Sequence, residues 1–511
     1  MINKKITTLD QLGLISNKFK KKGKNVVLCH GMFDLIHLGH IRYFQEAKEE
    51  GDILIVTLTA DKFCRKGPGR PIFSENLRAE SLAALEIIDY VAICPHPTGI
   101  EAIKIIKPNI YAKGKEYEIE SDDITGMIAE ERIAVELYKG QIFYTDNLVL
   151  SSSNLLNRNF DIFTPEVKEY INNLKSNFTL SEIIESLNNV KKSKILVIGD
   201  AIIDRYTYVK TLGQSGKGIH FSVLKDYSVD YPGGSLAVAN HIGAFSDDVT
   251  LLTGLGSKEK FDNYESYIRS NLISNVTPKI VYLNDSRTIV KERFIDKEMN
   301  KFFEIYHSID GQCPNSKENL ELVNWLDSNL QNFDIVVVPD YGEGLITHSM
   351  SKIISKKSKF LAINTQLNSG NRGYHVVNRY NSANFISLNE PELRLARHDK
   401  HGSISELSKA TAKLLGADFI SITQGPRGLD TYCKADDKSF KVPALSSSVV
   451  DRVGAGDAFL SISAICLGSD LKPEISIFLG ATAAAMDVQI IGNESTINRV
   501  DLIKYVTALL K

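Results

Sequence analysis

Short apolar runs alternate with segments of helical spacing in the first part of the chain. The apolar runs predict buried strands at residues 25–29, 52–58, 90–93 and 109–112. Between them, residues 40–50 and 74–85 have the apolar spacing of amphipathic helices. Strands that alternate with helices predict a parallel sheet with both faces covered, and such sheets bind ligands at the carboxyl ends of their strands.

The pattern changes at residues 159–192, which are polar and rich in Asn, Lys and Ser. Helical periodicity is modest there, at Val167, Tyr170, Ile171 and Leu174. We predict a helical linker over this stretch. A new apolar strand follows at 194–200 and ends in Gly-Asp, and residues 218–231 alternate polar and apolar positions as an exposed β-flap would.

Strand and helix patterns then alternate again to the end of the chain. Apolar runs predict strands at residues 335–339, 360–364, 385–388 and 419–423, and an Ala-rich helical region at 475–488 closes the sequence. The two halves share no internal repeat. The pattern predicts two α/β domains, at residues 1–158 and 193–511, joined by the linker at 159–192.

Composition narrows the class of protein. The length of 511 residues allows two to four domains, and 43% hydrophobic with 24% charged residues is the balance of a soluble globular protein. The formal net charge of -2 excludes a global basic field for nucleic acid. We expect no membrane partner, because no apolar run is long enough to cross a bilayer and the polar residues 1–10 have no signal-peptide core.

Cysteine usage adds an expectation about location. The six cysteines are too scattered for a disulfide framework or a zinc site. Cys29, Cys64 and Cys94 are best interpreted as core or near-core thiols of a reducing compartment, and we therefore expect a cytoplasmic protein.

The first chemical motif is CHGMFDLIHLGH at residues 29–40, which follows a predicted strand and opens a helix. His37 and His40 are three apart, so both can face one ligand. The N–H groups and positive dipole of a helix start favour phosphate, and imidazole donors suit charge stabilisation during nucleotidyl transfer. A zinc pair or two core histidines are the alternatives. Gly39 between the histidines and the segment 31–34 before them favour the phosphate site.

At these residues the chain resembles the cytidylyltransferase-like nucleotidyltransferases with their H-x-G-H signature, over residues 25–158. It is most similar to the adenylyltransferase domain of the bifunctional heptose kinase/adenylyltransferases of lipopolysaccharide synthesis. The resemblance implies that His37 and His40 stabilise the transferring phosphate, that Lys66 contacts phosphate, and that Asp34 holds the loop or meets the substrate. It places the remaining nucleotide and phosphate contacts at Gly31, Phe33, Gly39, Arg78, Lys113, Ser151, Ser152 and Ser153. Met32 and the serine run depart from the common family residues, but the hydroxyls are kept.

The second chemical motif is DRVGAGDAF at residues 451–459. Small residues at Gly454, Ala455 and Gly456 let a backbone approach phosphate closely, and successive N–H groups before a helix make an anion hole. Asp457 beside such a hole can take a proton from a sugar hydroxyl that attacks a γ-phosphate. The alternative is a glycine-rich helix start with an aspartate near the dipole.

Residues 194–500 resemble the ribokinase-like (PfkB) family, through GDAIID at 199–204, PGGSLAVAN at 232–240, NEPE at 389–392 and TQGPRG at 423–428. The resemblance implies that Asp457 is the general base and that residues 454–456 form the anion hole. It places the sugar site at Asp200, Asp204, Gly233, Gly234 and Asn240, magnesium and phosphate at Asn389 and Glu392, and the nucleotide beside Thr423, Gly425 and Gly428.

Three segments leave the substrate open. Arg293, in VKERF at 290–294, either reaches the sugar or phosphate or belongs to a solvated charge run. The segment NTQ at 364–366 with NSGNR at 368–372 replaces an Asp-Pro-Lys-like element of the heptose kinases, and residues 211–217 lack the expected prolines. The domain order is also the reverse of that in the bifunctional enzymes.

The fold expected is thus α/β with two doubly wound domains, a Rossmann-like nucleotidyltransferase followed by a ribokinase-like domain with a small β-flap. The function expected is phosphorylation of a sugar or sugar phosphate by ATP and nucleotidyl transfer from ATP or CTP to a sugar 1-phosphate, with Mg²⁺ in both sites, for surface polysaccharide. The alternative is that only the transferase is active and the kinase-like domain regulates or assembles. Because the flap has unpaired edges, we also expect a homodimer.

Overall fold

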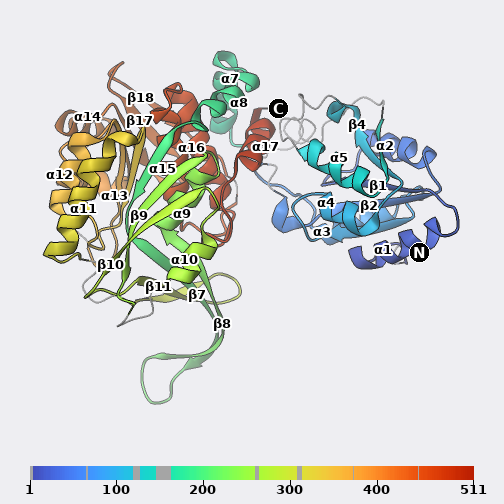
Figure 1. Ribbon diagram of the computed structural model, residues 1–511, viewed down its shortest axis with the longest axis horizontal. Coiled ribbons are helices and arrows are strands. Elements are labelled where there is room, and N and C mark those ends of the chain that lie inside the picture. Colours follow the sequence, from blue (N-terminus) through green and yellow to red (C-terminus); the bar gives the residue numbers. More distant parts are fainter. Residues whose placement is uncertain are drawn as a thin grey trace. The chain divides into compact units, whose positions relative to one another are not determined.

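The computed structural model of the chain describes residues 4–64, 67–118, 127–145, 163–258, 264–307, 313–371, 373–446 and 448–510. The chain forms two compact units, one from Met1–Thr164 with Ile503–Lys511 and one from Pro165–Leu502. Each unit has its own mainly parallel sheet covered by helices, which confirms the predicted α/β class (Figure 1).

The first unit contains a five-stranded sheet in the order β3-β2-β1-β4-β5, and every pairing in it is parallel. The four predicted strands are confirmed as β1 (Val26–Gly31), β2 (Ile53–Thr59), β3 (Tyr90–Cys94) and β4 (Ile110–Gly114). Strand β5 (Gln141–Thr145) was not predicted, because only one of its residues is buried and it therefore lacks a continuous apolar run. The order reverses at β1 and β4, so a ligand crevice is expected at the carboxyl ends of these two strands.

Helices cover both faces of this sheet. Two of them, α2 (Leu38–Glu49) and α3 (Glu75–Ala83), lie where the apolar spacing predicts, and three more are α1 (Leu9–Lys20), α4 (Ile100–Ile106) and α5 (Met127–Leu137). Successive residues of β1 point to opposite faces, so Val27 and Cys29 pack in one buried cluster while Val26 and Leu28 pack in another. Burial on both faces explains why the strand is a continuous apolar run.

The second unit contains a nine-stranded sheet in the order β10-β9-β6-β13-β14-β15-β16-β17-β18. The pairings are parallel from β10 to β16 and antiparallel from β16 to β18. The predicted strands are confirmed as β6 (Lys194–Ile198), β13 (Ile335–Asp340), β14 (Phe360–Thr365), β15 (Phe385–Asn389) and β16 (Phe419–Thr423). The others are β9 (Asp248–Gly256), β10 (Val276–Leu283), β17 (Leu429–Cys433) and β18 (Lys438–Val442).

The segment expected to be a linker is helical and belongs to the second unit. It forms α7 (Pro165–Asn177) and α8 (Leu180–Val190), each with one buried apolar stripe. The ring of Tyr170 in α7 lies 6.3 Å, centroid to centroid, from the ring of Phe478. The stripe therefore packs within the second unit.

The remaining helices of the second unit surround its sheet. They are α9 (Ser235–Gly243), α10 (Glu265–Asn271), α11 (Ser316–Asn329), α12 (His348–Lys357), α13 (Glu390–Arg397), α14 (Ile404–Leu415), α15 (Ala455–Gly468) and α16 (Pro473–Asp487). The predicted Ala-rich helix is α16, but it does not close the chain, because α17 (Arg499–Leu510) follows it.

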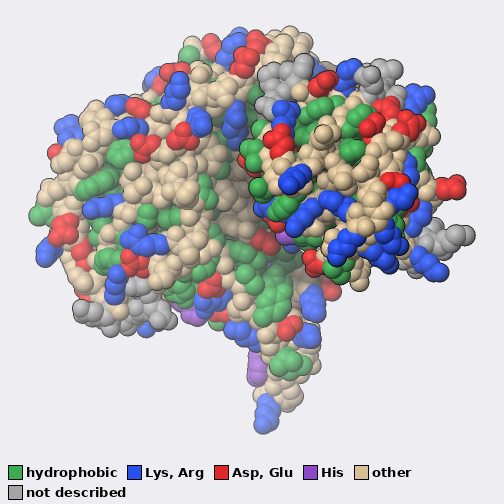
Figure 2. All heavy atoms as spheres, turned by 45° about the vertical axis from the view of Figure 1, so that its right-hand side comes forward, with side chains coloured by type: hydrophobic (Ala, Val, Ile, Leu, Met, Phe, Trp, Pro, Cys, Tyr) green, Lys and Arg blue, Asp and Glu red, His purple; other side chains and the backbone are tan. Residues whose placement is uncertain are grey.

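A second, four-stranded sheet in the order β12-β11-β7-β8 forms the flap. It consists of β7 (Ala201–Gln214), β8 (Phe221–Gly234), β11 (Ile289–Ile295) and β12 (Lys301–Tyr306), so the predicted exposed β-flap is confirmed in β8. Strands β7 and β8 form a long antiparallel hairpin that projects from the second unit, with hydrophobic side chains on its surface (Figure 2). Large exposed apolar residues of the hairpin are Leu212, Ile219, Phe221, Leu224 and Tyr227.

Two further expectations concern the cysteines and the membrane. All six cysteines are free thiols, and Cys29, Cys64 and Cys94 are buried as predicted. Among the described residues, no helix is both long enough and apolar enough to span a membrane.

Candidate active sites of the two units

The two histidines of the first unit lie at the start of α2, directly after β1. His37 is the residue before the helix, and its Nδ1 accepts a hydrogen bond from the N–H of Gly39 at 3.1 Å. The rings of His37 and His40 are stacked with centroids 4.0 Å apart and planes 25° apart. Both rings are half-buried, so they belong to neither the core nor the open surface.

The hydrogen bond to Gly39 fixes how His37 can act. An imidazole nitrogen that accepts a hydrogen bond carries no proton, so the proton of neutral His37 lies on Nε2. Burial lowers the pKa of His37, which favours this neutral form. Nε2–H is then a donor at a helix start, whose positive dipole end is also suited to phosphate oxygens.

The loop before α2 is held from two sides. Phe33 adopts a left-handed backbone with φ 47°, and its buried ring lies edge-on to His40 at 5.5 Å. Both oxygens of Asp34 accept the N–H of Ile72, at 2.8 and 2.9 Å, and one also accepts the N–H of Phe73 at 3.1 Å. Of the two roles expected for Asp34, the structure supports that of holding the loop. Gly31 is needed because a Cβ there would lie 2.9 Å from the Phe33 ring.

Arg78 has a different place from the one expected of a phosphate ligand. Its side chain is 1% exposed and donates to the carbonyl oxygens of Met32, Thr59 and Phe73 and to Asp61. A buried arginine with four of its five N–H donors bonded to the chain itself joins loops rather than binding a nucleotide. The expected phosphate contact at Arg78 is therefore corrected to a structural role, because the side chain is buried and these four donors are committed.

Lys113, at the end of β4, lies at the predicted carboxyl edge of the sheet. Its Nζ is 2.6 Å from Glu131 of α5, and both side chains are largely buried. A phosphate contact there would have to share Lys113 with this carboxylate. Lys66 and Ser151, Ser152 and Ser153 lie outside the described residues, so their expected phosphate contacts remain predictions.

The zinc alternative finds no support in the geometry. Among the described residues, no group of three or more His, Cys, Asp or Glu side chains could hold a metal ion. The Nδ1 atom of His37 is already occupied by the N–H of Gly39. The histidine pair therefore fits hydrogen bonding to phosphate better than metal binding.

In the second unit, the glycine-rich motif forms the start of α15. Gly454 precedes the helix with φ 98°, and a Cβ at this position would lie 2.7 Å from Asp487 and 2.8 Å from Asn493. Only glycine fits both the backbone and the space. The N–H groups of the first turn have no partner within the helix, and the space beside Gly456 is open, so this turn can cradle an anion.

Asp457 lies in this first turn and has an unusual environment. Tyr341, which follows β13, donates its hydroxyl to Oδ1 of Asp457 at 2.8 Å. Burial raises the pKa of Asp457 to about 7, the Tyr341 hydrogen bond and Lys291 act in the opposite direction, and Asp204 and Glu392 raise it further. A carboxyl group that titrates near neutrality beside an anion cradle is suited to general-base chemistry.

The expected sugar-facing residues of the flap form a charged cluster near Asp457. Asp204 of β7 pairs with Arg293 of β11 at 2.5 Å, and Arg293 also contacts Glu304 of β12 at 3.1 Å. A Cβ at Gly233 would lie 2.0 Å from Oδ2 of Asp204, so glycine is required for this carboxylate to fit. Gly234, with φ 58°, lets the flap turn into α9.

The charge run around Arg293 is not solvated, which removes that alternative. Lys291, Glu292 and Arg293 are between 6% and 8% exposed. Lys291 pairs with Glu343 at 2.9 Å, and Arg293 is shared between two carboxylates. Buried charges are stable only when paired, and these pairs form one wall of the cluster.

Two residues expected in the sugar site lie elsewhere. Asp200 is completely buried, and its Oδ1 accepts the N–H of Leu345 at 3.2 Å. Asn240 is 4% exposed, donates to the carbonyl of Asn271 and accepts the N–H of Ile273. Direct sugar contact is therefore corrected to support of the surrounding chain, because neither side chain reaches an open surface.

The expected metal ligands instead cap a helix. Oδ1 of Asn389 accepts the N–H of Glu392 at 2.9 Å, and Oε2 of Glu392 accepts the N–H of Asn389 at 2.7 Å, the reciprocal bonds of a capping box on α13. Oε1 of Glu392 accepts the N–H of Leu367. Both oxygens of Glu392 thus accept backbone N–H groups, and the expected place of this pair at magnesium and phosphate stays a prediction.

The turn expected beside the nucleotide joins β16 to β17. Gly425 and Gly428 have φ of 59° and 76°, and a Cβ at Gly428 would lie 2.1 Å from the carbonyl oxygen of Val442. The sheet register pairs Thr423 with Asn389, so both lie at the carboxyl edge of the sheet. The structure thus brings these two predicted residues together.

The sequence interpretation missed the most informative group around Asp457. Tyr341, Glu343 and Lys291 were not singled out, although all three are in or near it. The predicted strand at 335–339 was a usable signal, because residues directly after a parallel strand lie at the ligand-binding edge.

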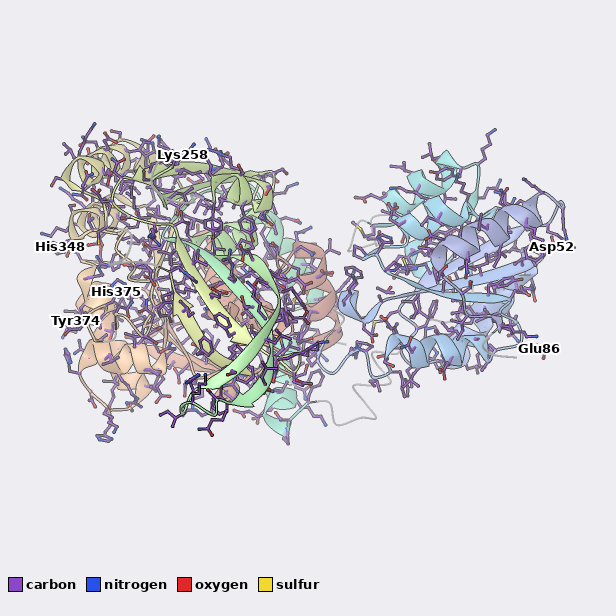
Figure 3. All side chains as sticks on the ribbon, turned by 90° about the horizontal axis from the view of Figure 1, so that it is seen from below. Asp52, Glu86, Lys258, His348, Tyr374 and His375 are labelled. Carbon is purple, nitrogen blue, oxygen red and sulfur yellow. The ribbon has the colours of Figure 1, made fainter. Side chains whose placement is uncertain are left out.

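A separate pocket of about 440 Å³ lies beside the segment that follows β13. Its lining includes Gly342, Thr347, His375 and Arg379, but not Asp457. Tyr374 and His375 lie together on this side of the second unit (Figure 3). His375 and Arg379 both contact Asp340, so this wall is held by a buried carboxylate.

The second unit has a ribokinase-like fold, with a large mainly parallel sheet and a flap. Its glycine-rich helix start lies beside Asp457, whose pKa is raised to about 7. The chain belongs to the pfkB family of carbohydrate kinases, whose family model matches residues 192–498. The cytidylyltransferase-like family model matches residues 28–159, which contain the histidine pair.

Individual relatives cover parts of the chain. It is 39% identical over 142 residues to the bifunctional protein HldE of Aliarcobacter butzleri, covering 27% of this chain and 29% of that protein. It is 41% identical over 139 residues to the bifunctional protein HldE of Nitratiruptor sp., covering 27% and 30%. The chain thus matches less than a third of the length of these curated relatives.

Solved structures support the fold of the second unit. The tetrameric inhibited form of phosphofructokinase-2 from Escherichia coli has a TM-score of 0.50 at 14% identity, and covers 62% of this chain and 100% of its own. The complex of that enzyme with fructose-6-phosphate gives the same values. At this identity the likeness establishes the fold alone.

Proposed function

We propose that the chain is a bifunctional sugar-activating enzyme. Its second unit phosphorylates a sugar or sugar phosphate with ATP, and its first unit joins a sugar 1-phosphate to a nucleotide and releases pyrophosphate. The observation that carries the proposal is that each unit has a helix start suited to phosphate, with His37 and His40 at one and Asp457 at the other. The resemblance of residues 25–158 to heptose adenylyltransferase domains is the ground for proposing heptose-like sugars and surface polysaccharide synthesis, and the match to bifunctional HldE proteins supports two activities in one chain.

In the kinase reaction, Asp457 accepts the proton of a sugar hydroxyl as that oxygen attacks the γ-phosphorus. The bond from the γ-phosphorus to the β-phosphate oxygen breaks, and ADP leaves. The N–H groups at the start of α15 stabilise the charge that develops on the transferring phosphoryl group. The paired Asp204 and Arg293 of the flap face the same cluster and are placed to orient the sugar.

In the transferase reaction, an oxygen of the sugar 1-phosphate attacks the α-phosphorus of a nucleoside triphosphate. The bond to pyrophosphate breaks, and no covalent enzyme intermediate is required. His37 and His40 donate hydrogen bonds to the phosphate oxygens, with the start of α2 beneath them. ATP is favoured by the resemblance to adenylyltransferase domains, and CTP is the other candidate of the wider cytidylyltransferase-like family.

Mg²⁺ enters this proposal as part of the nucleotide substrate. It binds proteins through few carboxylates and keeps several waters together with substrate phosphates. That habit agrees with the lack of a dedicated cage among the described residues. The free thiols further support the expected reducing, cytoplasmic location.

A homodimer through the flap also belongs to the proposal. The hairpin carries five large exposed apolar residues, and both β8 and β12 are edge strands of the small sheet. Exposed edges with apolar side chains favour pairing with another copy.

The two activities should be separable by single substitutions. We expect Asp457→Asn to lower ATP-dependent sugar phosphorylation at least about a hundredfold and to spare pyrophosphate release. His40→Ala should lower pyrophosphate release by about a hundredfold and spare phosphorylation. The measurement is a mass-spectrometric screen of sugars and sugar phosphates with ATP and CTP, using the full chain.

Wild-type protein that forms neither product with any sugar would refute the proposal. Loss of both activities from either single substitution, with the fold intact by circular dichroism, would refute independent sites. Pyrophosphate release without any sugar phosphorylation would instead favour the alternative, in which the second unit regulates or assembles.

A further inference from the structure

Tyr341 is held firmly against Asp457. It follows β13 directly, its side chain is 2% exposed, and its hydroxyl lies 2.8 Å from Oδ1 of Asp457. The amide groups of Asn368 and Asn371 both donate to the backbone carbonyl of Tyr341, at 3.0 and 2.9 Å. The position of the hydroxyl is therefore fixed by the fold and not by the Asp457 contact alone.

Asp457 is surrounded by groups of both signs. The negative groups are Asp204 of β7 and Glu392 of α13, and the positive group is Lys291 of β11, which is itself paired with Glu343. Asp200 and Asp340 lie further along the same edge. Burial and the two carboxylates oppose the ionised form of Asp457, while Tyr341 and Lys291 favour it.

A general base must be ionised to accept a proton, so the balance of these groups decides when the site can work. We propose that Tyr341 is a positioning residue that donates its hydroxyl to one oxygen of Asp457, favours the ionised carboxylate, and leaves the second carboxylate oxygen for the substrate hydroxyl. This inference rests on the kinase activity proposed above.

The chemistry of Tyr341 suits that role. Burial and the neighbouring Asp457 raise the pKa of Tyr341 well above its ordinary value, so its hydroxyl keeps its proton and acts only as a donor. A donor to the carboxylate stabilises the ionised form and not the neutral one. Because Tyr341 contacts Asp457 and not the reacting atoms, its effect should appear in the pH dependence of the reaction.

The first test compares the pH profiles of kcat/KM for sugar phosphorylation by wild type and Tyr341→Phe. Removal of the hydroxyl raises the pKa of Asp457, so we expect the acidic limb to move about one pH unit higher. The variant should be about tenfold slower at pH 6 and within about threefold of wild type at pH 9. An equal loss at every pH, or a limb that stays in place, would overturn the inference.

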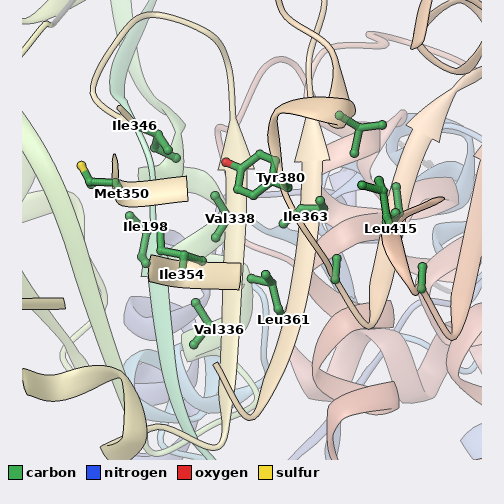
Figure 4. Packing of buried hydrophobic residues seen from close by; sticks show 14 of the residues in the cluster. Ile198, Val336, Val338, Ile346, Met350, Ile354, Leu361, Ile363, Tyr380 and Leu415 are labelled. Carbon is green, nitrogen blue, oxygen red and sulfur yellow. The ribbon is translucent and has the colours of Figure 1, made fainter. Parts of the chain in front are cut away.

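Tyr380→Phe is the matched control. Tyr380 is 1% exposed and packs in the hydrophobic cluster of the second unit (Figure 4). It donates its hydroxyl to Asp340 at 2.7 Å, so it is also a buried tyrosine bonded to a buried aspartate. It does not contact Asp457, and its substitution should leave the acidic limb in place. A shift equal to that of Tyr341→Phe would show that any loss of a buried hydroxyl moves the profile, and would also overturn the inference.

A second measurement needs no sugar substrate. The full chain is prepared with ¹³C-labelled aspartate carboxyl groups, and their ¹³C NMR signals are followed as the pH is changed. The Asp457 signal is identified by its loss in Asp457→Asn. We expect the Asp457 titration to move to higher pH in Tyr341→Phe and to stay in place in Tyr380→Phe. An unchanged titration refutes the role of Tyr341. A shifted titration in a protein that phosphorylates no sugar upholds that role while the proposed kinase activity fails.

Discussion

At the scale of single residues, Asp200 is a second aspartate, besides Asp457, whose pKa the fold raises strongly. It lies just after β6 with no exposed surface, and burial followed by repulsion from Asp340 and Glu343 raises its pKa to about 7 from an ordinary value of 3.8. Between about pH 4 and pH 7, Asp200 is therefore protonated in the folded protein and ionised in the unfolded chain. Its contribution to stability falls as pH rises from about 4 to about 7.

We expect Asp200→Asn to remove this pH dependence. The amide oxygen can still accept the N–H of Leu345, but the side chain no longer ionises. The variant should gain at least about 1 kcal/mol in unfolding free energy relative to wild type on going from pH 5 to pH 8. The measurement is urea unfolding of the second unit at both pH values.

Asp226→Asn, on the exposed part of the flap, is the control and should show no such difference. Equal pH dependence in wild type and Asp200→Asn would show that Asp200 is already ionised in the folded protein at pH 5, contrary to the burial argument.

At the scale of elements, β7 and β8 shape the sugar side of the site through a close approach. The register places Gly233 opposite Ile202, and Asp204 lies over Gly233 with no room for a Cβ. Since Asp204 also holds Arg293, this glycine fixes the position of the whole charged pair.

Gly233→Ala should therefore weaken sugar binding. The added methyl group must displace Asp204, so we expect KM for the sugar to rise at least about tenfold while KM for ATP changes little. Steady-state kinetics with each substrate varied in turn measures both values. Gly216→Ala at the flap tip, where a Cβ would meet no atom within 4 Å, is the control. An unchanged sugar KM in Gly233→Ala would place the sugar away from Asp204.

At the scale of the whole molecule, the flap is the part of the second unit best suited to hold two copies together. Ile219 is 91% and Phe221 is 73% exposed at the end of the hairpin. Such side chains favour association, because a partner that covers them removes apolar surface from water.

We expect wild-type protein to be a dimer in multi-angle light scattering. The double variant Ile219→Asp with Phe221→Asp should be a monomer with unchanged circular dichroism, because charges at a buried interface oppose association. A monomeric wild type, or a double variant that stays dimeric, would contradict a flap-mediated dimer.

The amino-acid sequence alone determined the architecture of both units. Buried parallel strands must be continuous apolar runs, so most of them could be located directly, and half-exposed strands such as β5 could not. The loop motifs at His37 and Gly454 were also readable, because helix starts and positive φ angles demand particular residue types.

Only the tertiary structure decided which polar residues work together. Three side chains have polar groups that could bind a ligand, but in the fold they hydrogen-bond to backbone groups: Arg78, Asn240 and Glu392. Tyr341 lies 116 positions from Asp457 in the chain, and no local pattern joins them. Strand order and register decide which distant segments meet, and so which side chains are buried and which hydrogen-bond to each other. That arrangement raises the pKa of Asp457 toward neutrality and gives other polar residues a structural role.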